Sequence, residues 1–135
     1  MNAISYHRLP WMGAVAFRGA DARRFLQAQL TADVAALDGG DAVAAGWCNP
    51  QGRVLAVLWL LAGEDRIVAI LPRSMAPVVA AGLGRFVLRA KVVVTDESPR
   101  LAIAGLSRLE PDAGADWPRP PRLVSGRLPG ARVLL

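Results

Sequence analysis

The sequence of 135 residues is 53% hydrophobic, which is enough for one domain with its own buried core. It holds one cysteine and one histidine, which excludes an internal disulfide and a Cys/His metal cluster, and no apolar run approaches the ~18 residues of a membrane span. We therefore expect a cytoplasmic protein with no membrane partner. The net charge of +5 comes from scattered arginines, with lysine only at Lys91, so no basic stripe follows a phosphate backbone and a nucleic-acid partner is not expected.

The first elements alternate between strand and helix periodicity. Residues 13–17 predict a short strand, and residues 20–30 predict a helix whose apolar positions fall on one face. Asp21 lies in the first turn of that helix, where a carboxylate favours the positive end of the helix dipole. A Gly/Asp-rich turn at 38–41 ends this part of the chain.

A β-hairpin follows. Residues 42–48 and 53–61 predict two strands around the loop N-P-Q-G at 49–52, whose glycine allows a positive φ. The second strand is apolar on both faces, as in a central strand that is covered on both sides. Another turn leads to a strand at 66–71.

The second half predicts one helix and three strands. Ser74 begins a helix whose apolar spacing continues to Val87, and strands follow at 91–95 and 101–106. Residues 107–122 are rich in proline and glycine and predict an exposed loop before a final strand at 132–135. We expect residues 1–135 to form one α+β domain, with an antiparallel sheet and two main helices on one face.

Three sequence blocks together resemble a known family. They are G-A-V-A-F-R-G-A-D-A-R-R-F-L-Q-A-Q-L-T-A-D-V at 13–34, A-A-G-W-C-N-P-Q-G-R-V-L at 44–55 and F-V-L-R-A-K-V at 86–92. In this order they resemble the YgfZ-type folate-binding proteins of the glycine-cleavage T-protein superfamily. The resemblance implies the N-terminal α+β folate-binding module, tetrahydrofolate as ligand, and a role in making or repairing iron–sulfur enzymes.

Two departures from the family limit what the resemblance implies. The K-G-C-Y-x-G-Q-E signature of the YgfZ branch does not occur, so we expect only the N-terminal part of the family, either as a partial domain that lacks a C-terminal domain or as a free-standing domain. Cys48 is in a different block and is no substitute for the signature cysteine. The transferases have N-E-x-G-G-x-x-D-D-L at the hairpin, and its two acids fall on Ala56 and Val57. Neither side chain accepts a proton, so we expect no aminomethyltransferase activity.

Several residues are candidates for ligand contact, each beside a plainer interpretation. Asp33 either braces the loop after the first helix or contacts a ligand. The two hairpin tryptophans either fill the core or offer a stacking surface for a pterin. Arg89 and Lys91, two apart on an expected strand, either form a solvated edge or bind the glutamate tail of a folate. We expect Cys48 to fill the core and His7 to be exposed. The candidate folate ligands are Asp33, Trp47, Asn49, Trp59, Arg89 and Lys91.

The sequence thus predicts a tetrahydrofolate-binding module of a YgfZ-like protein that serves iron–sulfur cluster assembly or repair without transferase activity. A protein-interaction domain that keeps the fold without a ligand is the alternative. The family's folate site draws on further domains, so we expect this chain to bind folate weakly by itself. The expected partners are folate, iron–sulfur proteins or a further domain, and a second copy that pairs with the final strand at 132–135, which we expect to be an uncovered sheet edge.

Overall fold

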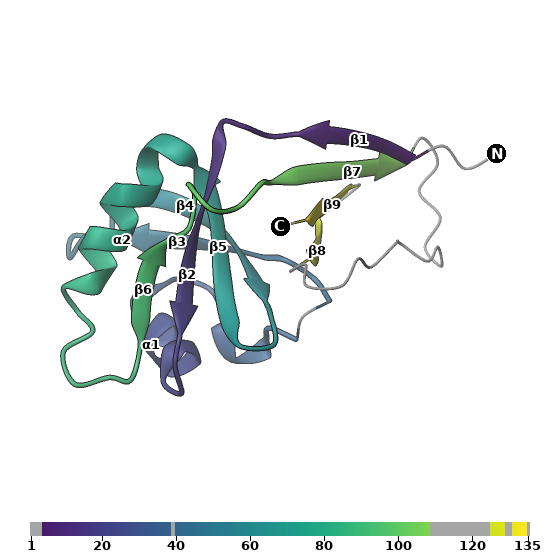
Figure 1. Cartoon of the computed structure of the whole chain (residues 1–135). Coiled ribbons are helices and arrows are strands. Elements are labelled where there is room, and N and C mark those ends of the chain that lie inside the picture. The colour runs from purple at the N-terminus through teal and green to yellow at the C-terminus, as the bar shows by residue number, and fades with distance from the viewer. Residues whose placement is uncertain (1–3, 39, 109–124, 129–130, 135) are drawn as a thin grey trace.

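Two antiparallel β-sheets and two α-helices make up the described chain (Figure 1). This computed structural model describes residues 4–38, 40–108, 125–128 and 131–134. The expected α+β class is confirmed. The elements are β1 (Ile4–Arg8), β2 (Met12–Arg18), α1 (Ala22–Gln29), the 3-10 turn η1 (Val34–Ala36), β3 (Val43–Cys48), β4 (Val54–Ala62), β5 (Arg66–Pro72), the 3-10 turn η2 (Arg73–Met75), α2 (Ala76–Gly84), β6 (Val93–Asp96), β7 (Ala104–Arg108), β8 (Ser125–Leu128) and β9 (Ala131–Leu134).

The larger sheet has five strands in the order β3-β4-β5-β2-β6, and every neighbouring pair is antiparallel. Its central strands are apolar on both faces because both faces are covered. On β2, residues 13–17 are all buried, and on β5 residues 67–71 are. The expected strands at 13–17, 42–48, 53–61 and 66–71 are therefore confirmed to within two residues at each end.

Both helices cover the same face of this sheet, which we call the helix face. Val15 and Phe17 of β2 point to it, and they join a core with Phe25 and Leu26 of α1 and Leu83 of α2. Side chains alternate along a strand, so the neighbouring positions point to the opposite face. There they form a second core, made of Ala14, Leu61, Val68, Ile70 and Ile103.

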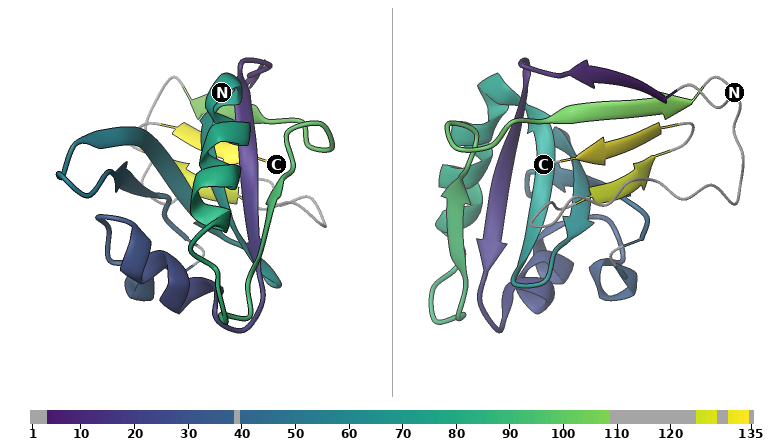
Figure 2. Two further views of the ribbon diagram at one scale, coloured as in Figure 1. Left: turned by 90° about the vertical axis from the view of Figure 1, so that its left-hand side faces the viewer. Right: turned by 45° about the vertical axis from the view of Figure 1, so that its right-hand side comes forward.

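The second sheet has four strands in the order β1-β7-β9-β8 and projects from the end of the first, as Figure 2 shows. Its strand β9 covers residues 132–134 of the expected final strand, but the expectation that this strand is an uncovered edge is wrong. β9 pairs with β7 on one side and with β8 on the other. Its backbone groups are therefore used within the sheet, and the proposed pairing of a second copy with this strand loses its physical basis. β1 and β8 were not predicted.

The helix boundaries differ from the expected ones. α1 begins at Ala22, and Asp21 is its N-cap residue, although its carboxylate makes no capping hydrogen bond. Ser74 lies in η2 and does not cap α2, which ends at Gly84 instead of continuing to Val87. Two glycines in the last turn lower the helix propensity there, and the apolar spacing beyond them belongs to a loop.

Part of the expected Pro/Gly-rich loop at 107–122 is strand, because β7 extends to Arg108. The rest of that loop lies outside the described residues, as does Leu135 of the expected final strand. Within the described ranges, no helix is both long enough and apolar enough to cross a membrane.

Candidate functional site

The β3–β4 hairpin turn is held by the side chain of Asn49. Its Oδ1 accepts hydrogen bonds from the backbone N–H groups of Gln51 (3.0 Å) and Arg53 (2.9 Å). Gly52 has φ +80° and donates its N–H to the Asn49 carbonyl (2.9 Å). The expected positive-φ glycine is confirmed. The side-chain oxygen of Asn49 is thus used to build the turn, as is common for asparagine, and only the amide nitrogen remains for a ligand.

The two positions that align with the transferase acids point to opposite faces of the sheet. Ala56 is buried at 8% exposure in the helix-face core, whereas Val57 is 57% exposed. This difference follows from the period of two along a strand. Only the second position is therefore open to a ligand, and it carries an isopropyl group where the family resemblance leads us to expect the transferase carboxylate.

Val57 lies in an apolar surface that we call the hairpin face. Gly46 of β3 is opposite Val57, and Ala44 is opposite Trp59. Val54 closes the surface at the turn, since its Cγ2 would lie 3.9 Å from a Cβ at Gly46. The hairpin face consists of Ala44, Gly46, Val54, Val57 and Trp59. Cys48 pairs with Val54 and, by the alternation along β3, points to the same side. Neither β3 nor β4 carries a carboxylate or a histidine, so this face can bury a flat apolar ring but lacks an acid of the kind that the transferases use.

The two hairpin tryptophans do not form one stacking surface, and that expectation is wrong. Trp47 lies opposite Ala56 and packs against the helix-face core. Its ring fills the space at Gly82 of α2, where a Cβ would come within 2.2 Å of Trp47 Cη2. Trp59 packs against the core of the opposite face. Only Trp59 shares a face with Val57, and it remains a candidate for ligand stacking.

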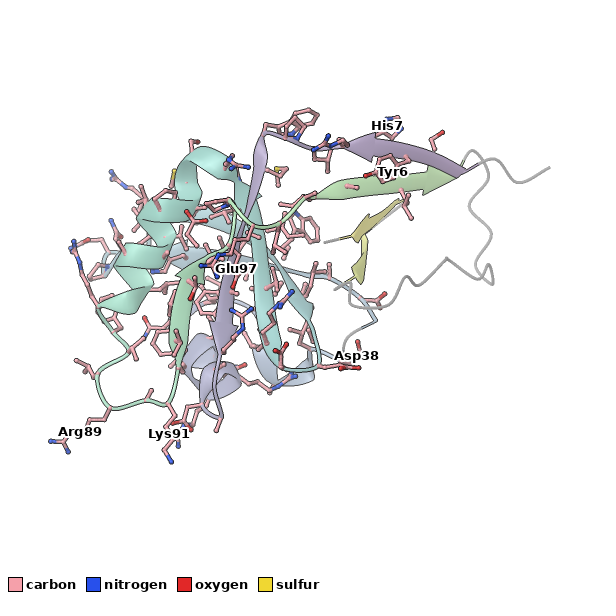
Figure 3. All side chains as sticks on the ribbon, viewed as in Figure 1. Tyr6, His7, Asp38, Arg89, Lys91 and Glu97 are labelled. Atoms are coloured by element: carbon pink, nitrogen blue, oxygen red, sulfur yellow. The ribbon has the colours of Figure 1, made fainter. Side chains whose placement is uncertain are left out.

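Arg89 and Lys91 are not on a strand, contrary to expectation. They lie in the loop between α2 and β6, and the strand begins at Val93. This loop leads into β6, which is the sheet edge opposite β3. Figure 3 shows both side chains pointing outward at the end of that loop. The structure therefore does not bring Arg89 and Lys91 together with the hairpin face.

Asp33 precedes η1 and is exposed, without a side-chain capping hydrogen bond. Its neighbour Thr31 was missed by the sequence reasoning. Thr31 Oγ1 accepts the N–H of Gly46 (2.8 Å), and the Thr31 N–H donates to the Gly46 carbonyl (3.0 Å). The segment before Asp33 thus runs along the edge of β3, which places Asp33 near the hairpin. Nothing in the sequence signals this contact, because Thr31 and Gly46 are 15 residues apart.

Cys48 and His7 complete the placement of the expected residues. Cys48 is half-buried at the end of β3, where the pairing register with β4 shifts, and it lies outside both buried cores. The expectation that it fills the core is therefore wrong. His7 is exposed on β1, as expected, and Figure 3 shows it at the far end of the molecule from Lys91.

Comparison with known proteins identifies relatives. A scan against models of protein families finds no match. The chain is 36% identical over 105 residues to the tRNA-modifying protein YgfZ of Edwardsiella ictaluri, covering 76% of this chain and 31% of the relative. It is 33% identical over 89 residues to the protein of the same name from Enterobacter sp., covering 64% of the chain and 27% of the relative.

Two further proteins extend the comparison. The mitochondrial iron–sulfur cluster assembly factor IBA57 homolog of Mycosarcoma maydis is 33% identical over 104 residues, covering 67% of this chain and 26% of the relative. The aminomethyltransferase T of the glycine cleavage system from Bartonella henselae has the same fold, with a TM-score of 0.65 and 22% identity over 76% of this chain and 28% of that chain. The chain thus spans less than a third of the length of these proteins. By its relatives it belongs to the YgfZ type of protein, and it has the fold of the glycine-cleavage aminomethyltransferase T.

Proposed function

We propose that this chain is a tetrahydrofolate-binding module that serves iron–sulfur cluster assembly or repair and has no aminomethyltransferase activity. The direction of this proposal comes from its relatives, one named an iron–sulfur cluster assembly factor and others named tRNA-modifying proteins. The chain matches less than a third of each of them, so the activity of the whole proteins is carried over only as a proposal.

The observation that carries the chemical part of the proposal is the exposed Val57 on an apolar hairpin face. A carboxylate at that position would supply an electrostatic contribution of several kcal/mol to a transferase. An isopropyl group supplies none, but it leaves a surface on which a pterin ring can lie beside Trp59. This arrangement favours binding without group transfer.

A ligand-free interaction domain is the second candidate. It is favoured by the exposure of the same surface, since Val54 and Val57 are 55% and 57% exposed. Exposed apolar side chains that lie together are typical of protein contacts as well as of ligand sites. The two functions differ in whether folate reaches Trp59.

Titration with tetrahydrofolate, followed by tryptophan fluorescence and calorimetry, separates the two candidates. Well-formed sites bury most of a ligand, and a face without further domains loses several contacts of about 1 kcal/mol each, so we expect a Kd of about 100 µM or weaker. Fluorescence quenching should disappear in Trp59→Phe and persist in Trp47→Phe, because only Trp59 lies on the hairpin face. Arg89→Ala should leave the affinity unchanged.

Other outcomes would redirect the proposal. Neither heat nor quenching at millimolar folate would favour the interaction domain. A sub-micromolar Kd would contradict the argument that the face is incomplete without further domains. Quenching that depends on Trp47 would place the ligand on the wrong face of the sheet.

The absence of transferase activity is tested separately. With saturating tetrahydrofolate and an aminomethyl-lipoyl donor protein, we expect no turnover above the uncatalysed reaction. Turnover that survives Asp33→Asn would show that the alignment of Val57 with the transferase carboxylate is wrong.

A further inference from the structure

Helix α2 has an apolar outer surface. Its sequence, A-P-V-V-A-A-G-L-G, contains no polar side chain. Val79 and Leu83 are buried against the sheet, yet Val78 is 54% exposed and Ala81 is exposed on the outside. Figure 2 shows α2 on the outside of the molecule. A surface helix usually carries polar residues on its outer face, and a helix that is apolar all round is usually covered.

The loop that follows α2 continues this apolar surface. We call residues 85–91 the basic loop. Phe86 is 53% exposed and Leu88 is 88% exposed, whereas Val87 and Ala90 of the same loop pack against the helix-face core. Phe86 and Leu88 are therefore exposed on a loop whose other two apolar residues pack against the core. Leu88 has φ +44°, a conformation that leucine rarely adopts.

Backbone contacts fix this loop in place. The Lys91 N–H donates to Asp21 Oδ2 (2.8 Å), and the Asp21 N–H donates to the Lys91 carbonyl (3.2 Å). Gly19 allows the close approach, since a Cβ there would lie 2.0 Å from the Lys91 oxygen. These contacts hold the loop at its base. The backbone at the strained Leu88 is therefore already ordered before a partner binds, so binding loses little further conformational entropy.

The charged residues of the basic loop itself are all positive. Arg85, Arg89 and Lys91 are exposed, and residues 85–91 contain no acid. The Asp21 carboxylate at the base of the loop already contacts the Lys91 backbone and lies 3.5 Å from Arg24 Nη2. An apolar centre with a charged rim is the usual anatomy of a protein interface.

We propose that the outer face of α2 and the basic loop form a docking surface for a partner protein that has an apolar recess for Leu88 and Phe86 and carboxylates around it. A second copy of this chain fits less well, because it would bring like charges together. A nucleic acid also fits less well, because the centre is apolar and only three cations surround it. This surface is separate from the hairpin face, so the inference does not depend on folate binding.

The test uses a display library of small folded proteins with randomised surfaces, selected against the whole chain. We expect the enriched binders to be rich in acidic residues around an apolar recess. Leu88→Gly should weaken them by about tenfold or more, while the stability of the chain is kept or raised because glycine accepts a positive φ. This opposite effect on binding and stability separates docking from a structural role.

Charge reversal and remote controls complete the experiment. Arg89→Glu should weaken the same binders by about tenfold, and added salt should weaken their binding to the unmodified chain. Tyr6→Ala and Arg53→Glu, exposed changes elsewhere, should have no effect. Enriched binders whose affinity is unchanged by Leu88→Gly would overturn the proposal. So would tighter binding of an RNA oligonucleotide with the same dependence on Leu88, or dimerisation of the chain that Leu88→Gly abolishes.

Discussion

Replacing Gly19 with alanine would test how the basic loop is attached to the rest of the fold. Gly19 has φ +122°, and an added Cβ would meet three backbone atoms, two of Lys91 at 2.0 Å and 2.8 Å and one of Val92 at 3.2 Å. Because none of these is the end of a flexible side chain, the loop itself must move. The contact with the Lys91 oxygen has to open from 2.0 Å to at least 3.0 Å.

The free energy of unfolding should fall by about 3 kcal/mol. Alanine at a positive φ costs about 1–2 kcal/mol. Movement of the loop weakens the two hydrogen bonds between Asp21 and Lys91, which together contribute about 2 kcal/mol. The reduced entropy of the unfolded chain returns about 0.4–1 kcal/mol.

Two other glycines give matched controls in the same denaturant-unfolding assay. Gly52 also has a positive φ, but a Cβ there meets nothing within 4 Å, so Gly52→Ala should cost only about 1 kcal/mol. Gly84 ends α2 in open space, so Gly84→Ala should stabilise by about 0.5–1 kcal/mol. If Gly19→Ala costs no more than Gly52→Ala, the backbone contact with Lys91 contributes nothing and the argument for a fixed loop fails.

Three more experiments test the packing. Ser98 Oγ accepts a hydrogen bond from the N–H of the buried Ala14 (3.1 Å). Ser98→Ala should therefore lower the free energy of unfolding by about 1–3 kcal/mol, because it leaves that N–H unpaired. No measurable loss would mean that the N–H finds another acceptor. Arg18 Nη1 lies 2.5 Å from the carboxylate of the buried Glu97. Arg18→Met should lower the free energy of unfolding by about 2 kcal/mol, which is less than the ~3–5 kcal/mol of a fully buried pair, because the Arg18 side chain is 34% exposed. Adding Glu97→Gln should restore part of this loss. Ala56→Asp should lower the free energy of unfolding by at least about 3 kcal/mol because it buries a carboxylate, whereas Val57→Asp should lower it by about 1 kcal/mol or less. Equal losses would contradict the faces of the sheet to which we assign Ala56 and Val57.

Local patterns in the sequence were sufficient for most of the larger sheet. The apolar runs of β4 and β5 and the N-P-Q-G turn are short-range signals, and the structure has each of them where the sequence places it. The glycine at the end of that turn needs a positive φ for a purely local reason. These elements are predictable because the residues that determine them are neighbours in the chain.

The second sheet depends on contacts between distant residues. β1 pairs with β7, about a hundred residues later in the chain, and nothing within Ile4–Arg8 specifies that partner. For the same reason the final strand looked like an edge, although β7 and β8 pair with it on both sides. The prediction of the end of α2 was wrong for a different reason. The apolar residues after Gly84 continue the helical spacing, although they lie in a loop.

The candidate site was predicted only in part. The reason is that its residues were grouped by residue type and not by the face of the sheet to which they point. Trp47 and Trp59 lie on adjacent strands, but the register pairs Trp47 with Ala56 and Trp59 with Ala44. Since 56 and 59 differ by an odd number, the two rings must point to opposite faces of the sheet. The same parity places Trp59 with Val57 and separates both from Ala56. If a pterin stacks on Trp59, as we propose, it meets Val57, the position that the family resemblance aligns with the transferase acid, so the two parts of the proposal can be tested on one surface.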